Sequence, residues 1–421
     1  MNNSKSKSLK SGASFLIFLA WLVYSTSYIG RVNYSANITQ IIDFYGITKA
    51  EAGTVPTFMF FAYGIGQVLN GIMCKKYNIK WMIFISLFFS SIINLTIGVT
   101  NNFAIIKWLW MLNGILLSVL WPTLIRLMSE NLPKKELGRS SVIIGTTVAC
   151  GTIFIYALSS VYAIFDKFKL AFFTAAVMGI LVSVFWILSY KKAVTSARKE
   201  MKEEKITEDS KKIETGNKND SIKNKIYIAI GVLCFSAVGV NLIKDGLTTW
   251  VPSILKEVGK TTDSMSILLT LFLPLVSISG NNFALRVRKK VPNAITHTLI
   301  TSIAMGIVVG IVMGGISIES VLIMLVGMII VSFFASSLNS LITSIFPMFM
   351  RENINSGLWA GVLNGFCYVG STISSYGLGV IADHFGWSAV FLCLLIACVL
   401  IIVVCLIGIL IQRMQKSKQL G

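Results

Sequence analysis

The stretch IYIAIGVLCFSAVGVNLIKDGLTTWVPSIL (residues 226–255) decides the fold class of this chain. It carries no charged side chain from Ile226 to Ile243, and then Lys244 and Asp245 follow side by side before the apolar sequence resumes. A run of about 20 predominantly apolar residues is long enough to cross a bilayer as a helix. The stretch therefore predicts a membrane-spanning helix with two charges deep inside it.

Similar apolar runs recur along the whole chain. Of its 421 residues, 55% are hydrophobic and only 13% are charged, a composition more apolar than that of soluble proteins. We expect an all-α, multi-pass integral membrane protein of a bacterial-type plasma membrane, with twelve spans. The predicted spans are 13–42, 50–74, 79–99, 102–129, 138–163, 168–190, 226–255, 262–284, 293–315, 318–346, 354–381 and 387–411.

The excess of positive charge lies in alternate connections between these spans. The chain has 37 Lys and Arg against 18 Asp and Glu, a formal net charge of +19. In a soluble chain such an excess would suggest nucleic acid as a partner, but the positive-inside rule places these loops and both termini in the cytoplasm. The positive charge therefore indicates which loops are cytoplasmic, and the expected partner is the bilayer, not nucleic acid. The clusters are Lys5, Lys7 and Lys10; Lys75, Lys76 and Lys80; Lys134, Lys135 and Arg139; Arg286, Arg288, Lys289 and Lys290; and Arg413, Lys416 and Lys418.

One strongly polar segment divides the chain. Residues 191–225 are rich in Lys, Glu, Asp, Asn and Ser, which predicts a solvated, disordered cytoplasmic linker. On either side of it we expect a six-helix bundle, one over residues 1–190 and one over residues 226–421.

The two bundles look like copies of one repeat. A shift of 213 residues aligns a cation deep in each opening helix and similar residues in the turn that follows. Two parallel six-helix repeats are typical of the major facilitator fold, in which the substrate binds between the halves near the midplane. The aligned pairs are Arg31 with Lys244, Gly46 with Gly259, Thr48 with Thr261, Lys75 with Arg288 and Lys76 with Lys289.

Arg31 and Lys244 are the candidate binding residues. A cation at the centre of a membrane helix costs roughly 2.5–3.5 kcal/mol, and two cations facing one cavity would form an anion site. The alternative is that each snorkels to the outer headgroups or forms an ion pair that serves packing. Adjacent residues on a helix point about 100° apart, so we expect Asp245 not to share a face with Lys244. Asp245 then either bonds a neighbouring helix or, if water reaches it, carries a coupling proton.

The remaining charged residues, histidines and cysteines give no indication of a catalytic site. Arg126 has Glu130 as an i,i+4 partner, which predicts a structural ion pair or a gate. His297 and His384 stand alone, and no C-x-x-C spacing occurs among the seven cysteines. Without a cluster of His, Cys, Asp and Glu, we expect no metal, no cofactor and no enzymatic activity.

Glycine and proline residues add expectations about helix shape. Pro122, Pro274 and Pro347 predict breaks or kinks in otherwise helical spans. Gly306, Gly310 and Gly314, and likewise the pair Gly361 and Gly365, have the spacing that allows close helix packing.

Five stretches carry a family resemblance. They are YIGRVNYSANI (28–38), YGIGQVLNGIMCKKYNIK (63–80), NGILLSVLWPTLIRLMSENLPKKELG (113–138), GVNLIKDGLTTWVPSIL (239–255) and AGVLNGFCYVGSTISSYGLGVIADHFGW (360–387). They resemble the organophosphate:phosphate antiporters of the major facilitator superfamily, which carry glycerol phosphate and hexose phosphates. The resemblance implies that Arg31 is the phosphate-binding arginine and that Lys244 replaces the second substrate-binding arginine. The implied cavity aromatics are Tyr24, Tyr28, Tyr63, Trp121 and Tyr368, for which core packing is the alternative.

The departures from the family concern charge. Lys244 keeps the positive charge of the expected arginine but lacks its bidentate fork. Gln67 stands where a lysine is expected, and the expected histidine falls at about Val148. Lys75 replaces the acidic residue usual in the loop after the second helix, which argues against the family's usual loop gate. Lys75 and Arg126 are nevertheless the candidate gating residues. With fewer cations and an added Asp245, the cavity should favour an anion of lower charge than a sugar phosphate dianion.

The sequence therefore predicts a monomeric secondary transporter that moves a small organic anion by alternating access. An organophosphate exchanged for phosphate is the expected solute, and a proton-coupled organic carboxylate is the alternative. A membrane sensor that binds a sugar phosphate and signals to a partner is a further possibility.

Overall fold

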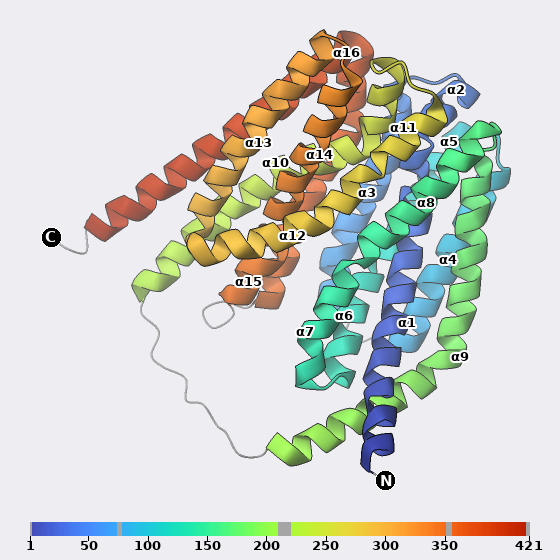
Figure 1. Ribbon diagram of the computed structural model, residues 1–421, viewed down its shortest axis with the longest axis vertical. Coiled ribbons are helices and arrows are strands. Elements are labelled where there is room, and N and C mark those ends of the chain that lie inside the picture. Colours follow the sequence, from blue (N-terminus) through green and yellow to red (C-terminus); the bar gives the residue numbers. More distant parts are fainter. Residues whose placement is uncertain (1, 74–77, 209–219, 351–355, 418–421) are drawn as a thin grey trace.

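The protein is almost entirely helical. The computed structural model describes residues 2–73, 78–208, 220–350 and 356–417. Two bundles lie side by side (Figure 1), as expected for an all-α membrane protein. Eleven helices in the described part of the chain are long and apolar enough to cross a membrane.

The N-terminal bundle is formed by the first nine helices. They are α1 Asn2–Ala36, α2 Ile38–Tyr45, α3 Lys49–Met73, α4 Ile79–Val99, α5 Phe103–Ser118, α6 Leu120–Asn131, α7 Lys134–Gly145, α8 Thr147–Ile164 and α9 Lys169–Glu208.

The C-terminal bundle contains the remaining elements. They are α10 Asp220–Glu257, α11 Asp263–Thr270, α12 Phe272–Lys290, α13 Ala294–Ser317, α14 Val321–Ser340, the short π-helix η2 Leu341–Ile345, α15 Phe346–Phe349 and α16 Ser356–Ser417.

Helix α16 contains the last two predicted spans. Its apolar part, Gly361–Gln415, has 55 residues, and at 1.5 Å per residue that is far longer than one bilayer crossing needs. Gly386 interrupts it with φ 75° and ψ 179°, a conformation that is not helical. The positive φ suits glycine, which has no Cβ to clash. The interruption lies between the predicted spans 354–381 and 387–411, so α16 consists of two arms.

The three prolines break their helices as predicted. Helix α6 begins at Leu120, just before Pro122, and α12 begins at Phe272, just before Pro274. Proline lacks an N–H and clashes with the carbonyl four residues earlier, so the first turn of a helix is where it is best tolerated. Pro347 likewise lies in the first turn of α15, directly after the π-helix.

The predicted disordered linker is partly wrong. Helix α9 continues to Glu208 and α10 begins at Asp220, so much of residues 191–225 is helical. The extension of α9 packs on the N-terminal bundle, where Ala193 and Ala197 are buried. The carboxylate of Glu200 accepts the backbone N–H of Ala13 at 3.1 Å. Composition suggested solvation, but these small residues form a contact face.

Two of the five glycines predicted to allow close packing do contact another helix: a Cβ on Gly306 would lie 3.4 Å from the Cβ of Cys398, and one on Gly365 would lie 3.6 Å from a methyl group of Val68. A Cβ on Gly310, Gly314 or Gly361 would meet no atom within 4 Å, so the packing role expected of these glycines is wrong. By contrast, a Cβ on Gly53 would lie 2.2 Å from the carbonyl oxygen of Ser375, which brings α3 of one bundle against α16 of the other. The two bundles therefore meet along a tight seam between α3 and α16.

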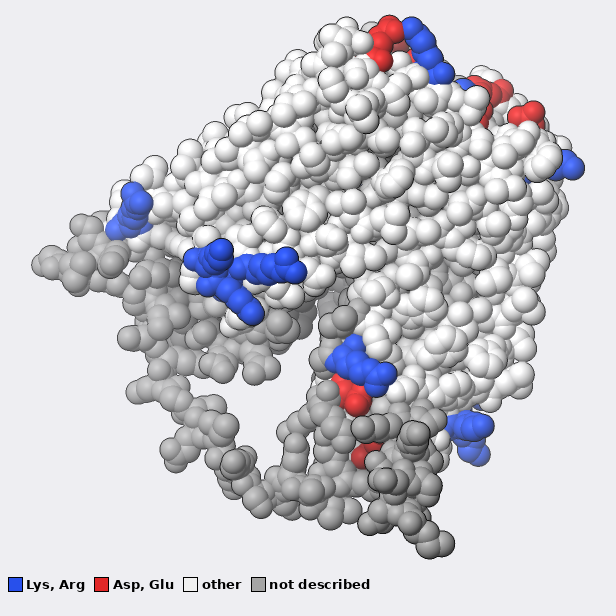
Figure 2. Space-filling view, in the orientation of Figure 1, with Lys and Arg blue, Asp and Glu red and all other residues white. Residues whose placement is uncertain are grey.

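The bundles meet at one end and separate at the other. In Figure 1 they converge near α2 and diverge toward α7 and α15, and Figure 2 shows the surface hollowed between them at the diverging end. We name these the closed end and the open end. In Figure 2 the charged residues gather toward the two ends, with an uncharged band between, as a membrane-spanning surface requires.

Candidate functional site: a caged arginine facing a lysine–aspartate pair

Arg31 lies on α1 at the boundary between the bundles, surrounded by aromatic rings. Its guanidinium carbon is 4.2 Å from the ring centroid of Tyr63, 5.2 Å from that of Tyr28, and 5.7 Å from those of Phe60 and Tyr368. Contacts of this kind each stabilise a cation by about 0.5–2 kcal/mol. We call these four rings the aromatic cage. Arg31 is thus held in place and does not extend freely into lipid.

The cage contains side chains from both bundles. Tyr28 is on α1, Phe60 and Tyr63 lie one turn apart on α3, and Tyr368 belongs to α16. Arg31 donates a hydrogen bond from Nη2 to the hydroxyl of Tyr368 at 3.4 Å. Among the described residues, Arg31 forms no ion pair with a carboxylate. The groups in direct contact with its positive charge, in the part of the chain that the structure describes, are therefore rings and a phenol.

The other predicted aromatics extend the cage. The ring of Tyr24 lies 5.4 Å from that of Tyr28 and 5.1 Å from that of Trp121. Gln67 donates to the hydroxyl of Tyr63 at 3.0 Å and accepts from Asn364 of the other bundle at 2.9 Å. The predicted substrate-binding aromatics and Gln67 therefore lie in one neighbourhood around Arg31.

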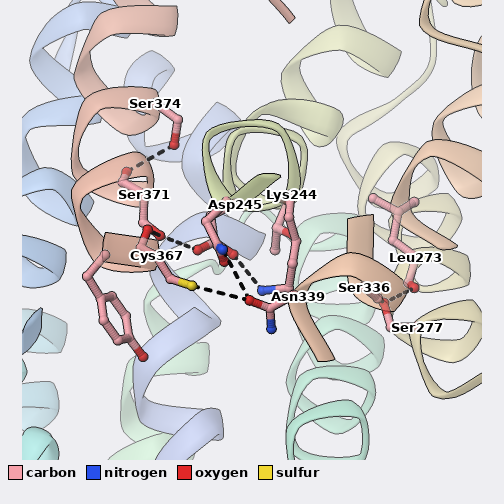
Figure 3. A network of polar contacts seen from close by, with 12 residues as sticks. Lys244, Asp245, Leu273, Ser277, Ser336, Asn339, Cys367, Ser371 and Ser374 are labelled. Carbon is pink, nitrogen blue, oxygen red and sulfur yellow. Dashed lines mark hydrogen bonds and ion pairs between the residues drawn. The ribbon is translucent and has the colours of Figure 1, made fainter. Parts of the chain in front are cut away.

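Lys244 and Asp245 form an ion pair on α10, with 2.9 Å between Nζ and Oδ1. The expectation that they do not share a face is thus wrong. Backbone directions are about 100° apart, but the long lysine side chain bends back across that angle. The other carboxylate oxygen of Asp245 accepts a hydrogen bond from the hydroxyl of Ser371 on α16 (Figure 3). The structure thus shows the bond to a neighbouring helix that was one of the two alternatives for Asp245.

Polar side chains continue this network inside the C-terminal bundle. Asn339 accepts hydrogen bonds from Asn241 at 3.1 Å and from the thiol of Cys367 at 3.6 Å (Figure 3). Asn339 is on α14 just before the π-helix Leu341–Ile345, and π-bulges occur frequently at functional sites.

One helical turn of α16 joins the two charged groups. Tyr368 contacts Arg31 of the N-terminal bundle, and Ser371, three residues later and on the same helix face, contacts Asp245. Two cations and one carboxylate leave the site with a single net positive charge.

Of the two candidate gating residues, the structure describes Arg126. Arg126 forms the predicted i,i+4 ion pair with Glu130 at 2.7 Å within α6. Lys75 lies outside the described residues.

Sequence reasoning missed Phe60, Asn364 and Ser371. Helical spacing was the signal that could have found them. Phe60 precedes Tyr63 by three residues, Asn364 precedes Tyr368 by four and Ser371 follows it by three, so each shares a face with a predicted residue.

Ion pairs hold the bundles together at the closed end. Lys256 of α10 contacts Asp43 of α2 at 2.5 Å and Asp263 at 3.0 Å. Lys49, which begins α3, lies 3.2 Å from Glu257 and 3.7 Å from Asp383.

Asp383 also binds backbone at the start of α3. Its carboxylate accepts the N–H groups of Lys49 at 3.1 Å and Ala50 at 2.6 Å. The first N–H groups of a helix have no partner within the helix, and its N-terminus favours a negative charge. Asp383 from the C-terminal bundle thus caps a helix of the N-terminal bundle.

An apolar groove of about 480 Å³ follows the seam between α3 and α16. Its lining includes the exposed side chains of Phe61, Ile65 and Val369, and none of the described residues that line it is charged. These features fit a surface that faces lipid rather than an aqueous cavity.

Comparison with known proteins places the chain among transporters. A probable hexose phosphate transport protein of Chlamydia pneumoniae is 25% identical over 30% of this chain and 27% of its own. The membrane sensor protein UhpC of Escherichia coli is 22% identical over 40% of this chain and 39% of its own. The glycerol-3-phosphate transporter of Bacillus subtilis is 24% identical over 56% and 55%. The chain thus spans between about a quarter and just over half of the length of these relatives. The names of the hexose phosphate and glycerol-3-phosphate transporters confirm the resemblance to organophosphate carriers.

Solved structures agree on the fold. A bacterial homolog of the human lysosomal transporter Spinster, in an inward-facing and occupied conformation, matches with a TM-score of 0.68 and 13% identity over 96% of this chain and 97% of its own. A D-xylose–proton symporter matches with a TM-score of 0.69 and 13% identity over 94% and 96%. The family model of the Major Facilitator Superfamily matches residues 20–356. This multi-pass membrane protein therefore belongs to the Major Facilitator Superfamily.

Proposed function

We propose that the protein is a secondary transporter that moves a small organic anion by alternating access, with an organophosphate exchanged for phosphate as the leading case. The observation that carries the proposal is the position of Arg31. A cation without a carboxylate partner among the described residues, held by rings from both bundles, is suited to bind an anion between them.

The proposed cycle uses the closed and open ends. Because the positive-inside rule places the open end in the cytoplasm, we propose that the structure is the inward-open state. An anion enters from the open end and binds at Arg31. The two bundles then rotate against each other. The ion pairs of Lys49 and Lys256 break, and the closed end opens to the outside.

The test uses purified protein in liposomes. Preloading with phosphate should drive uptake of labelled glycerol 3-phosphate or hexose 6-phosphate, and the Arg31→Ala variant should abolish this uptake. Absence of stimulation by internal phosphate would remove the exchange assignment.

A proton-coupled carboxylate symporter is the second candidate. Asp245 supports this candidate, because its carboxylate contacts both Lys244 and, through Ser371, helix α16. Protonation of Asp245 would weaken the ion pair with Lys244 and so alter the packing of the bundle. Asp245→Asn should then abolish accumulation driven by an acidic exterior while leaving exchange intact. Unchanged accumulation would clear Asp245 of the coupling role.

A sensor that binds without transport is the third candidate, because the membrane sensor protein UhpC is among the relatives. Anion binding by the purified protein, without counterflow of any bound anion in liposomes, would favour the sensor over the carrier.

A further inference from the structure

The ion pair on α10 leaves Arg31 as the site's surplus charge. Lys244 and Asp245 neutralise each other at 2.9 Å, and the hydroxyl of Ser371 holds the second carboxylate oxygen. Side-chain exposures of 30% for Lys244 and 16% for Asp245 put the pair partly out of water. Splitting such a pair leaves an uncompensated charge in a poorly solvated place.

The remaining polar groups of the site donate or accept hydrogen bonds without adding charge. Gln67 and Asn364 are amides that bond each other, and Gln67 also bonds the hydroxyl of Tyr63. Neutral donors of this kind suit the oxygens of an anion, but they do not balance a second negative charge.

We infer that Asp245 determines the charge class of the bound solute: by neutralising Lys244 it makes the site around Arg31 select an organic anion with one negative charge over an anion with two. This inference rests on the proposed function and names its substrate class. A second negative charge has no counter-cation among the described residues of the site, so its desolvation is not offset.

The substrate class follows from this charge. Carboxylates and phosphodiesters carry one negative charge at neutral pH. A phosphate monoester qualifies in its singly protonated form, which predominates below its second ionisation near pH 6. An organophosphate thus remains a substrate, and acidic conditions favour its binding.

The experiment compares two ligands that differ by one charge. Binding of glycerol 3-phosphate and of its methyl diester to the purified full-length protein is measured at about pH 7.5 by thermal shift and titration calorimetry. The wild type should bind the diester about tenfold more tightly, a ratio typical of one unbalanced charge nearby. Asp245→Asn should reverse this preference.

Two variants test whether charge itself is the cause. The double variant Lys244→Gln/Asp245→Asn has the net charge of the wild type and should regain the wild-type preference. Ser371→Ala removes the hydrogen bond to Asp245 but no charge, and it should keep the wild-type preference as well. Gln67→Lys adds a cation while leaving the pair intact, so it should shift binding toward the monoester even if Asp245→Asn does not fold.

The outcomes separate this inference from the proposed function. If the wild type binds anions but neither Asp245→Asn nor Gln67→Lys changes the diester-to-monoester ratio, the charge inference is wrong and the transporter proposal stands. The inference also fails if the double variant behaves like Asp245→Asn. If no anion binds to any variant, both proposals are overturned.

Discussion

The ammonium of Lys256 lies 2.5 Å from a carboxylate oxygen of Asp43, and the two residues stand 213 positions apart. That interval is the shift that aligns Arg31 with Lys244 in the sequence. Equivalent positions of two repeats contact each other where the axis that relates the repeats passes between them. The ion pair therefore marks the pseudo-twofold axis at the closed end.

Lys256→Gln should favour the conformation in which the closed end is open. The substitution removes a cation that contacts Asp43 across the bundles, and partly exposed pairs of this kind contribute about 0.2–1 kcal/mol. The expected shift is therefore up to several-fold in the ratio of the two states, measured by fluorescence between labels on the two bundles. Lys260→Gln is the matched control, because Lys260 pairs with Glu319 inside the C-terminal bundle. An equal shift in both variants would contradict a role for the axis pair.

Asp383→Asn should have a larger effect than Lys256→Gln. The carboxylate of Asp383 receives two backbone N–H groups from α3 and lies near the ammonium of Lys49, and its loss should cost about 1–2 kcal/mol of the closed state. The same fluorescence measurement applies.

Glu51→Gln is the control for Asp383→Asn. Glu51 accepts the N–H of Thr48 at 2.9 Å, so it caps the same helix end from within the N-terminal bundle. Its loss should lower the stability of α3 without changing the ratio of the two conformations. If Glu51→Gln changes the ratio of the two conformations as much as Asp383→Asn does, Asp383 acts only through the stability of α3.

Arg31→Lys should weaken anion binding by about tenfold or more. Lysine keeps the positive charge but loses the planar fork that binds phosphate or carboxylate oxygens in pairs and stacks against the rings of the aromatic cage. Calorimetric titration of the purified variant measures the effect. Arg139→Lys is the control, since Arg139 contacts Glu136 and Ser14 away from the cage. Wild-type affinity in Arg31→Lys would mean that the anion binds elsewhere.

Gly370→Ala should destabilise the C-terminal bundle. A Cβ at Gly370 would lie 2.0 Å from the carbonyl oxygen of Val238, so α10 and α16 would have to separate. Overpacking of this kind typically costs about 1–3 kcal/mol. Thermal unfolding in detergent should therefore begin several degrees lower.

Gly361→Ala on the same helix provides the comparison. A Cβ at Gly361 would have no atom within 4 Å, and alanine favours helix by about 1 kcal/mol over glycine. This variant should be at least as stable as the wild type. A Gly370→Ala variant with the same stability would show that the two helices can separate at little cost.

Local pattern predicted the elements well and the contacts less well. The separation of the last two spans, the helix breaks next to Pro122 and Pro274 and the pair of Arg126 with Glu130 all depend on residues within a few positions of each other. The extension of α9 to Glu208 was mispredicted, because its charged residues conceal a small-residue face that packs on α1.

The sequence by itself determined that this chain is a membrane protein of two repeats with a cation in each opening helix, because hydropathy, charge placement and repetition are properties of the linear order. Only the tertiary structure decided which partner each charge takes. Lys244 turns to Asp245, Arg31 enters a cage completed by Tyr368, and Lys49 meets Asp383. The rotation and register of packed helices set the last two pairings, which join residues more than 300 positions apart, and the second carboxylate oxygen of Asp245 is likewise held from another helix by Ser371.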